Sequence, residues 1–143
     1  MNGPLVVEHR TTASPEAVYR CLVASTEWAR WQGAEAEIDA SPGGIFRMTM
    51  AAGQTARGQF VEFAENRRVV FTWGWVDAPG IPPGSTLVEI DLVPEAGGTL
   101  IRLTHRDLGA GEVSLHRMGW EHYLPRLAAV AAGEPVGPDP GPG

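Results

Sequence analysis

The sequence predicts an α+β domain in which a curved antiparallel sheet of six to seven strands wraps around one long C-terminal helix. Two observations predict this fold class. Residues 36–105 alternate apolar and polar side chains with a period of two, which is typical of half-buried antiparallel strands. Residues 113–131 repeat apolar side chains at helical spacing, and only this segment is long enough to cover such a sheet. The 143 residues suffice for one domain.

The N-terminal part predicts one strand followed by two short helices. Residues 4–10 alternate as a strand does. Residues 14–16 read Ser-Pro-Glu, which combines an N-cap serine, a first-turn proline and an acid, so a helix begins there. One of the hydroxyl residues 25–26 is predicted to cap the second helix, which carries Trp28 and Trp31 on one face.

The period-two region divides at glycine- and proline-rich turns into consecutive strands. The predicted strands are 36–39, 46–50, 56–64, 67–76, 86–93 and 99–105. The segment 77–85 is too rich in proline and glycine for regular structure and is long for a hairpin connection. With Ile81 at its tip, it is either a lid or partner contact or a rigid connector without a role.

The C-terminal part predicts a helix and then an irregular tail. Pro125 lies inside the helix 113–131 and lacks an amide hydrogen, so a kink or a local break is expected there. Gly133 ends the helix, and residues 1–133 form the single predicted domain. Residues 134–143 are mostly proline and glycine, so we expect a flexible tail that does not pack.

Composition excludes several classes of function. All eleven basic residues are arginine, which excludes lysine chemistry such as a Schiff base or a phosphate-loop lysine. The net charge of −6 argues against nucleic acid or an anionic membrane as partner. Cys21 is the only cysteine, so an intrachain disulfide and a thiolate zinc site are excluded. No signal peptide or bilayer-spanning apolar run is recognisable, so we expect a cytoplasmic protein without membrane insertion.

Five segments in order carry a resemblance to a known superfamily. They read SPEAVYRCLVASTEWARW, SPGGIFRMTM, GQF with RRVVFTWGW, GTLIRLTHRDLG, and GWEHYLPRL. They are similar to the START-like (SRPBCC) superfamily, whose helix-grip fold is that of the birch-pollen allergen. Within it, the chain resembles the group related to the C-terminal domain of the activator of heat-shock-protein-90 ATPase, over about residues 4–132. The resemblance implies two short helices closing one end of the sheet and a central cavity between the sheet and the C-terminal helix.

Twelve residues on the predicted inner faces are candidates for a ligand-binding site in this cavity. They are Trp28, Trp31, Phe46, Met48, Phe60, Phe71, Trp73, Leu103, His105, His116, Trp120 and Leu124. The alternative is that they fill an ordinary core, because apolar periodic positions are mostly core. Composition and periodicity leave both interpretations open.

Two histidines are the only candidates for catalysis. His105 shares a strand face with apolar residues and His116 shares a helix face with Trp120, so both are expected to point inward. There, a histidine either orients a ligand or acts as a general acid or base, with Glu112 as the nearest helper to His116. The alternative is a neutral histidine bonded to a nearby carbonyl. No catalytic residue is assigned, and no spacing predicts a metal site or a cofactor.

Three functions follow from these candidates. The first is non-catalytic binding of a small hydrophobic or amphipathic ligand in the cavity. The second is a protein-interaction module of co-chaperone or regulatory type, with a chaperone as partner and an exposed apolar patch around Ile81 and the tail. The third is a cyclase- or hydrolase-like enzyme that uses a cavity histidine. Either a monomer or a homodimer formed through a sheet edge is compatible with the sequence.

Overall fold

The computed structural model describes residues 3–142, which form one curved sheet and three helices. The elements in chain order are β1 (Leu5–Thr11), α1 (Pro15–Arg20), α2 (Ser25–Trp31), β2 (Glu35–Ile38), β3 (Ile45–Thr49), β4 (Thr55–Ala64), β5 (Arg68–Trp73), β6 (Thr86–Glu95), β7 (Gly98–Arg106) and α3 (Ala110–Ala131). The described helices include none that is long and apolar enough to cross a lipid bilayer.

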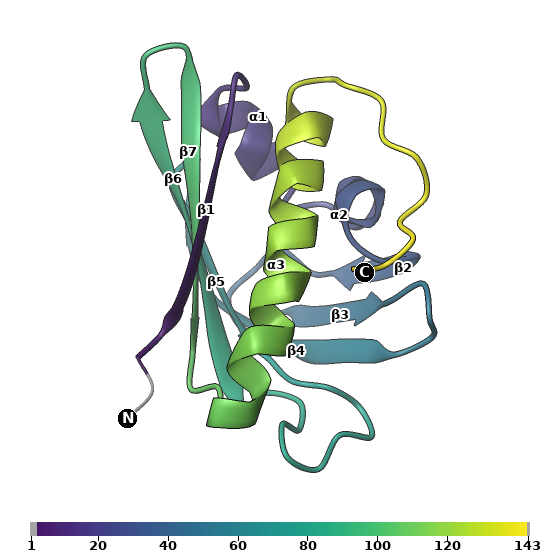
Figure 1. The fold of residues 1–143 in the computed structure, drawn as a ribbon. Helices are drawn as coiled ribbons and strands as arrows, with labels where there is room; N and C mark the ends of the chain where they lie inside the picture. The colour runs from purple at the N-terminus through teal and green to yellow at the C-terminus, as the bar shows by residue number, and fades with distance from the viewer. Residues whose placement is uncertain (1–2, 143) are drawn as a thin grey trace.

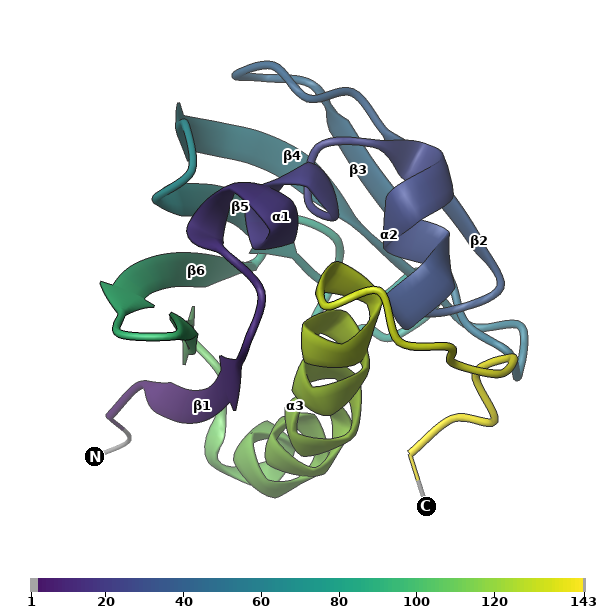
Figure 2. The ribbon, with the colours of Figure 1, turned by 90° about the horizontal axis from the view of Figure 1, so that it is seen from above.

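The sheet is antiparallel throughout and has the strand order β1-β7-β6-β5-β4-β3-β2. Consecutive strands from β2 to β7 are neighbours, and β1 closes the far edge by pairing with β7. A register shift between Phe60 and Glu62 in β4 marks a bulge, which bends a sheet. The strands arc around α3, while α1 and α2 close one end (Figures 1 and 2). The predicted fold class is confirmed.

The first two helices begin for different reasons. The Ser14 side chain accepts a hydrogen bond from the Ala17 amide, as the sequence predicts for the start of α1. The predicted cap of α2 is wrong, because the N-cap is Ala24 and makes no side-chain bond. Ser25 instead accepts a hydrogen bond from the Ile38 amide at 2.9 Å, so its hydroxyl ties α2 to β2.

Helix α3 runs unbroken through Pro125, so the local break predicted there is absent. Pro125 and Glu121 both lie on the exposed face of the helix. The Glu121 carbonyl, which lacks its usual amide donor, therefore faces water and can be hydrated there. The opposite face of α3 is free to pack continuously against the sheet.

The middle of the molecule is filled by aromatic rings. Phe46 on β3 stacks on Phe71 of β5, with ring centroids 4.5 Å apart. Trp28 of α2 contacts both rings edge-on, at 5.2 and 5.5 Å, and Phe60 of β4 completes the group. All four side chains are at most 1% exposed. Helix α2 therefore inserts its tryptophan into the concave side of the sheet and leaves little room there.

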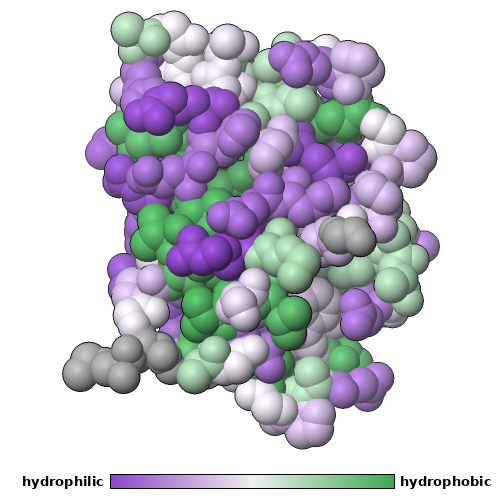
Figure 3. Space-filling view, in the orientation of Figure 1, coloured by the Kyte–Doolittle hydropathy of each residue, from purple (hydrophilic) through white to green (hydrophobic). Residues whose placement is uncertain are grey.

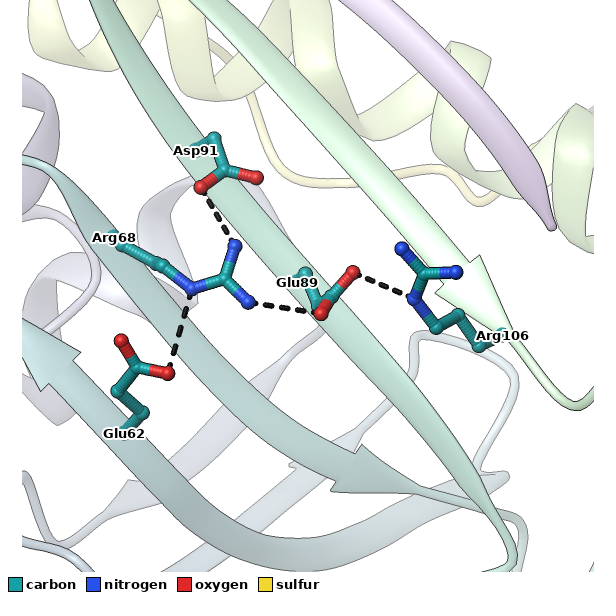
Figure 4. A network of polar contacts seen from close by, with 5 residues as sticks. All are labelled: Glu62, Arg68, Glu89, Asp91 and Arg106. Carbon is teal, nitrogen blue, oxygen red and sulfur yellow. Dashed lines mark hydrogen bonds and ion pairs between the residues drawn. The ribbon is translucent and has the colours of Figure 1, made fainter.

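The outer face of the sheet is charged and internally paired. Arg68 bonds Glu89 and Asp91 at 2.8 Å each and lies 3.5 Å from Glu62, while Arg106 bonds Glu89 at 2.8 Å (Figure 4). Partial burial alone would raise the pKa of Glu89, but the hydrogen bonds from Arg106 and Arg68 outweigh it and lower the pKa. Because the outer face is charged and solvated, an apolar binding site is expected on the side of the sheet that carries α3.

Candidate functional site

A cleft of about 720 Å³ opens at one end of the molecule, beside the N-terminal half of α3. The β3–β4 and β5–β6 connections form its other walls, together with the C-terminal residues 140–142. Its apolar lining includes the rings of Trp73, Trp75, Trp120 and Tyr123. This volume and this aromatic lining suit a small organic molecule.

A close backbone approach fixes one wall of the cleft. A Cβ atom added to Gly74 would lie 1.8 Å from the Pro82 carbonyl oxygen, so only glycine fits where the β5–β6 connection folds back. The Trp75 amide bonds the Ile81 carbonyl at 2.8 Å in the same fold-back. The connection therefore holds Ile81, which is 4% exposed, inside the cleft wall and not at an exposed tip.

The twelve residues that the sequence nominates separate into two groups. Trp73, His116 and Trp120 line the cleft. The other nine are at most 1% exposed and belong to the core: Trp28, Trp31, Phe46, Met48, Phe60, Phe71, Leu103, His105 and Leu124. The core interpretation describes these nine, because α2 fills the concave centre of the sheet with Trp28 and Trp31. The open space lies beside this filling, where Trp73 and Gln32 mark the boundary between core and cleft.

Several residues of the cleft were not nominated from the sequence. Tyr123 follows Trp120 by three positions, so helical spacing places both on one face and could have included it. Trp75 lies two positions after Trp73, as expected for one strand face, although β5 ends at Trp73 and Trp75 forms only an isolated bridge. Gln32 carries no signal, since a polar residue after a short helix is ordinarily exposed.

His105 is held between two partners that define its tautomer. The Trp120 indole Nε1–H donates to His105 Nδ1 at 3.0 Å, so Nδ1 carries no proton. His105 Nε2 then carries the proton and donates to Thr86 Oγ1 at 2.8 Å. Thr86 in turn donates to the Trp73 carbonyl at 2.8 Å. Every polar atom of this buried chain has a partner.

His116 has the opposite tautomer for the same reason. The Trp75 Nε1–H donates to His116 Nε2 at 3.1 Å, which leaves the proton on Nδ1. Nδ1 donates to the Glu112 carbonyl oxygen at 2.8 Å and lies 3.8 Å from the Glu112 carboxylate. The ring centroids of the two histidines are 5.1 Å apart. We call Trp75, His116, His105 and Trp120 the Trp–His seam, because together they join α3 to the sheet.

Burial keeps both histidines of the seam neutral. It lowers the pKa of His105 to about 3, helped by the nearby His116, and it lowers the pKa of His116 even though Glu112 favours the charged form. If either histidine were protonated, its ring N–H would face the N–H of the tryptophan. The indole N–H cannot accept a hydrogen bond, so the Trp–His bond would be lost. Neither ring therefore has a nitrogen free to take a proton from a bound molecule.

The C-terminal segment is anchored at the edge of the cleft by Asp139. Its carboxylate accepts hydrogen bonds from the Gly33 and Gly141 amides at 3.0 and 2.9 Å and lies 2.8 Å from His122 Nε2. Burial alone would raise the pKa of Asp139, but these hydrogen bonds outweigh it and lower the pKa. Arg126 also donates to the Gly137 carbonyl at 2.7 Å. The sequence predicts no packing for this segment, and these contacts correct that expectation.

Within residues 3–142, no three histidine, cysteine, aspartate or glutamate side chains lie close enough to hold a metal ion. Cys21 is buried, and burial raises the pKa of its thiol to about 11. A protonated, enclosed thiol packs as a small apolar side chain and is a poor nucleophile.

The family is decided by a match over most of the chain. Residues 12–132 match the sequence profile of the Activator of Hsp90 ATPase homolog 1-like proteins. The chain belongs to this family. The resemblance predicted from the five sequence segments is confirmed, and the matched region ends before the segment that carries Asp139.

Solved structures agree with the family. An AHSA1-like protein of Rhizobium etli is 42% identical over 98% of this chain and 89% of its own, with a TM-score of 0.73. The Aha1 dimer from Colwellia psychrerythraea is 16% identical over 92% and 97%, with a TM-score of 0.78. Protein MLL2253 of Mesorhizobium loti is 18% identical over 94% and 100%, with a TM-score of 0.82. The last two similarities concern the fold alone. No match was found among curated protein sequences.

Stability is predicted to fall in acid because of His105. The unfolded chain binds a proton near pH 6.5 and the folded chain only near pH 3, so protonation favours unfolding. The contribution of the neutral His105 ring to the free energy of unfolding is complete above about pH 6.5. It is lost toward pH 3, at about 1.4 kcal/mol per pH unit. Urea unfolding at successive pH values should therefore give a shallower slope for His105→Gln than for the wild type. An equal slope in both would contradict it, and His9→Gln, on the half-buried His9, is the matched control.

Asp139→Asn is predicted to release the C-terminal segment. The amide keeps the size of the side chain but replaces one acceptor oxygen with an NH₂ donor. Gly33 bonds one carboxylate oxygen, while His122 and Gly141 share the other, so one of these two sets of contacts is lost. Amide exchange at Gly33 and Gly141 should accelerate at least about tenfold, the effect of roughly 1.4 kcal/mol of lost local stability. Asp77→Asn, an exposed aspartate, is the control. Unchanged exchange would mean that the segment is held by its other contacts.

Proposed function

We propose that the chain binds a small hydrophobic or amphipathic molecule in the cleft and does not transform it. The observation that carries this proposal is the 720 Å³ cleft with rings from two walls, Trp73 and Trp75 on one side and Trp120 and Tyr123 on α3. Family membership supports a ligand-binding or Hsp90-ATPase-activator-like domain.

The state of the two histidines supports a non-catalytic role. A general base must offer a free lone pair to its substrate. His116 lines the cleft, but Trp75 occupies its Nε2 lone pair, and the Nδ1 proton is held by the Glu112 carbonyl. His105 is fully buried between Trp120 and Thr86. The seam therefore orients the walls of the cleft, and neither of its histidines is available as a general base.

Protein interaction of the ATPase-activator kind is the second candidate, because α3 exposes two large apolar side chains. Leu115 is 60% exposed and Met118 is 48% exposed. On the face that carries α3, hydrophobic residues lie interspersed with hydrophilic ones (Figure 3). If this function holds, the chain should raise the ATPase rate of a purified Hsp90 chaperone, and Leu115→Ser with Met118→Ser should abolish the effect.

Filling the cleft from α3 tests ligand binding directly. A Cβ atom at Gly119 meets nothing within 4 Å, and Gly119 lines the cleft. Gly119→Leu therefore places an isobutyl group in the open space, and it also favours the helix by about 1 kcal/mol. Binding of the uncharged dye Nile red, followed by its fluorescence, should weaken at least about tenfold, while thermal unfolding shifts upward or stays unchanged.

Gly111→Leu is the matched control. Gly111 lies in the first turn of α3, also has no atom within 4 Å of an added Cβ, and does not contact the cleft. This variant should bind Nile red as the wild type does. Equal binding by all three proteins, or no binding by the wild type, would contradict the proposal.

A further inference from the structure

Gln32 follows α2 and places a buried amide at the wall of the cleft. Gln32 is only 1% exposed, and it is one of the residues that line the cleft. Gln32 Oε1 accepts a hydrogen bond from the Trp28 indole Nε1–H at 2.8 Å. An indole N–H only donates, so the amide oxygen must face Trp28 and the NH₂ group must face the other way. The orientation of the amide is therefore fixed.

The NH₂ group of Gln32 is a donor without a partner in the described chain. No hydrogen bond joins its Nε2 atom to any residue of 3–142. Trp73 Nε1 is the single buried side-chain nitrogen or oxygen in those residues that is both unpartnered and fully enclosed. Gln32 Nε2 has no partner either but is not among these enclosed atoms, and Gln32 lines the cleft, so the cleft is the space from which a partner can approach it. It is therefore a donor that a bound molecule can meet at the wall of the cleft.

The charges of the cleft disfavour an anion. Its titratable lining residues are Asp77, Glu112, His116 and Tyr123. No arginine of the described chain lines it, and the sequence contains no lysine. An anionic ligand would lose its hydration on binding and would be repelled by the carboxylates of Asp77 and Glu112, with no positive side chain to compensate. An uncharged acceptor has no such cost and satisfies the Gln32 donor.

We infer that the cleft selects uncharged, largely apolar molecules that carry a carbonyl-type hydrogen-bond acceptor, which the Gln32 amide binds. The inference rests on the proposed function and adds the chemical class of the ligand. Selectivity arises because a hydrocarbon of the same shape leaves the buried donor unpaired.

Three probes of one ring system test the inference. 2-Acetonaphthone carries the carbonyl, 2-isopropenylnaphthalene replaces its oxygen with CH₂ at nearly the same shape, and 2-naphthoate carries a negative charge. Titrations of ¹⁵N-labelled protein, followed by NMR of side-chain amides and indoles, should show the ketone binding about fivefold more tightly than the alkene. The Gln32 NH₂ signals should shift with the ketone and stay in place with the alkene. 2-Naphthoate should bind more weakly than either.

Gln32→Glu reverses the polarity of the site. Glutamate keeps an acceptor for Trp28 and presents an oxygen to the cleft, so the preference for the ketone should disappear. Gln59→Glu, on the exposed face of β4, is the matched control and should keep it. The wild-type titrations need no variant, so they decide the matter even where Gln32→Glu fails to fold.

The outcomes separate this inference from the proposed function. If ketone and alkene bind the cleft equally and the Gln32 signals stay in place, the ligand class is wrong and the binding function stands. If 2-naphthoate binds most tightly, the charge argument is overturned. If the indole signals of Trp73 and Trp120 respond to no probe, the cleft does not bind such molecules and both proposals fail.

Discussion

The hydrogen bond from the Trp120 indole to His105 is the interaction on which the rest of the structure depends. It joins α3 to β7 in the interior, where no water competes with it. It also fixes the proton of His105 on Nε2, and so extends through Thr86 to the backbone of Trp73 on β5. The second Trp–His pair, Trp75 with His116, joins the same helix to the chain just beyond β5. The seam thus sets the distance between α3 and the sheet at the wall of the cleft.

The position of the cleft follows from this seam and from α2. Next to the seam, the two tryptophans of α2 fill the concave side of the sheet, and Trp28 packs on Phe46 and Phe71. Beside the seam, α3 offers Gly119, which has no side chain, opposite the connections between strands. The rings around Trp28 fill the centre of the grip, and the missing side chain at Gly119 leaves space along α3. This division explains how one helix-grip domain can have both a dense core and an open cleft.

The sequence predicts the architecture well because its signals are local or periodic. Alternation over six strands and helical spacing in the last element define the sheet and its cover. The inward direction of His105 and His116 follows from the same periodicities. Periodicity tells which face a side chain occupies, but it does not tell whether that face meets another ring or an opening. This is why residues such as Phe71 and Leu103 look like cleft residues in the sequence and lie in the core.

Contacts between distant segments have no such signal. Asp139 accepts a hydrogen bond from the amide of Gly33, which lies 106 positions earlier, and no sequence pattern in either segment predicts this contact. Gln32 likewise has no recognisable pattern in the sequence, because its role depends on the Trp28 indole that orients its amide. The unbroken course of α3 at Pro125 depends on exposure, which a single helix does not reveal. Polar groups buried by tertiary structure are therefore the residues that sequence reasoning misses here.

The protonation of the seam is the central claim, and long-range ¹H–¹⁵N NMR of the histidine rings measures it most directly. At pH 7, the account predicts two neutral rings, with the proton on Nε2 of His105 and on Nδ1 of His116. Nitrogen shifts of an imidazolium in either ring at that pH would contradict it. So would the same tautomer in both rings, because one of the two Trp–His hydrogen bonds could not then exist.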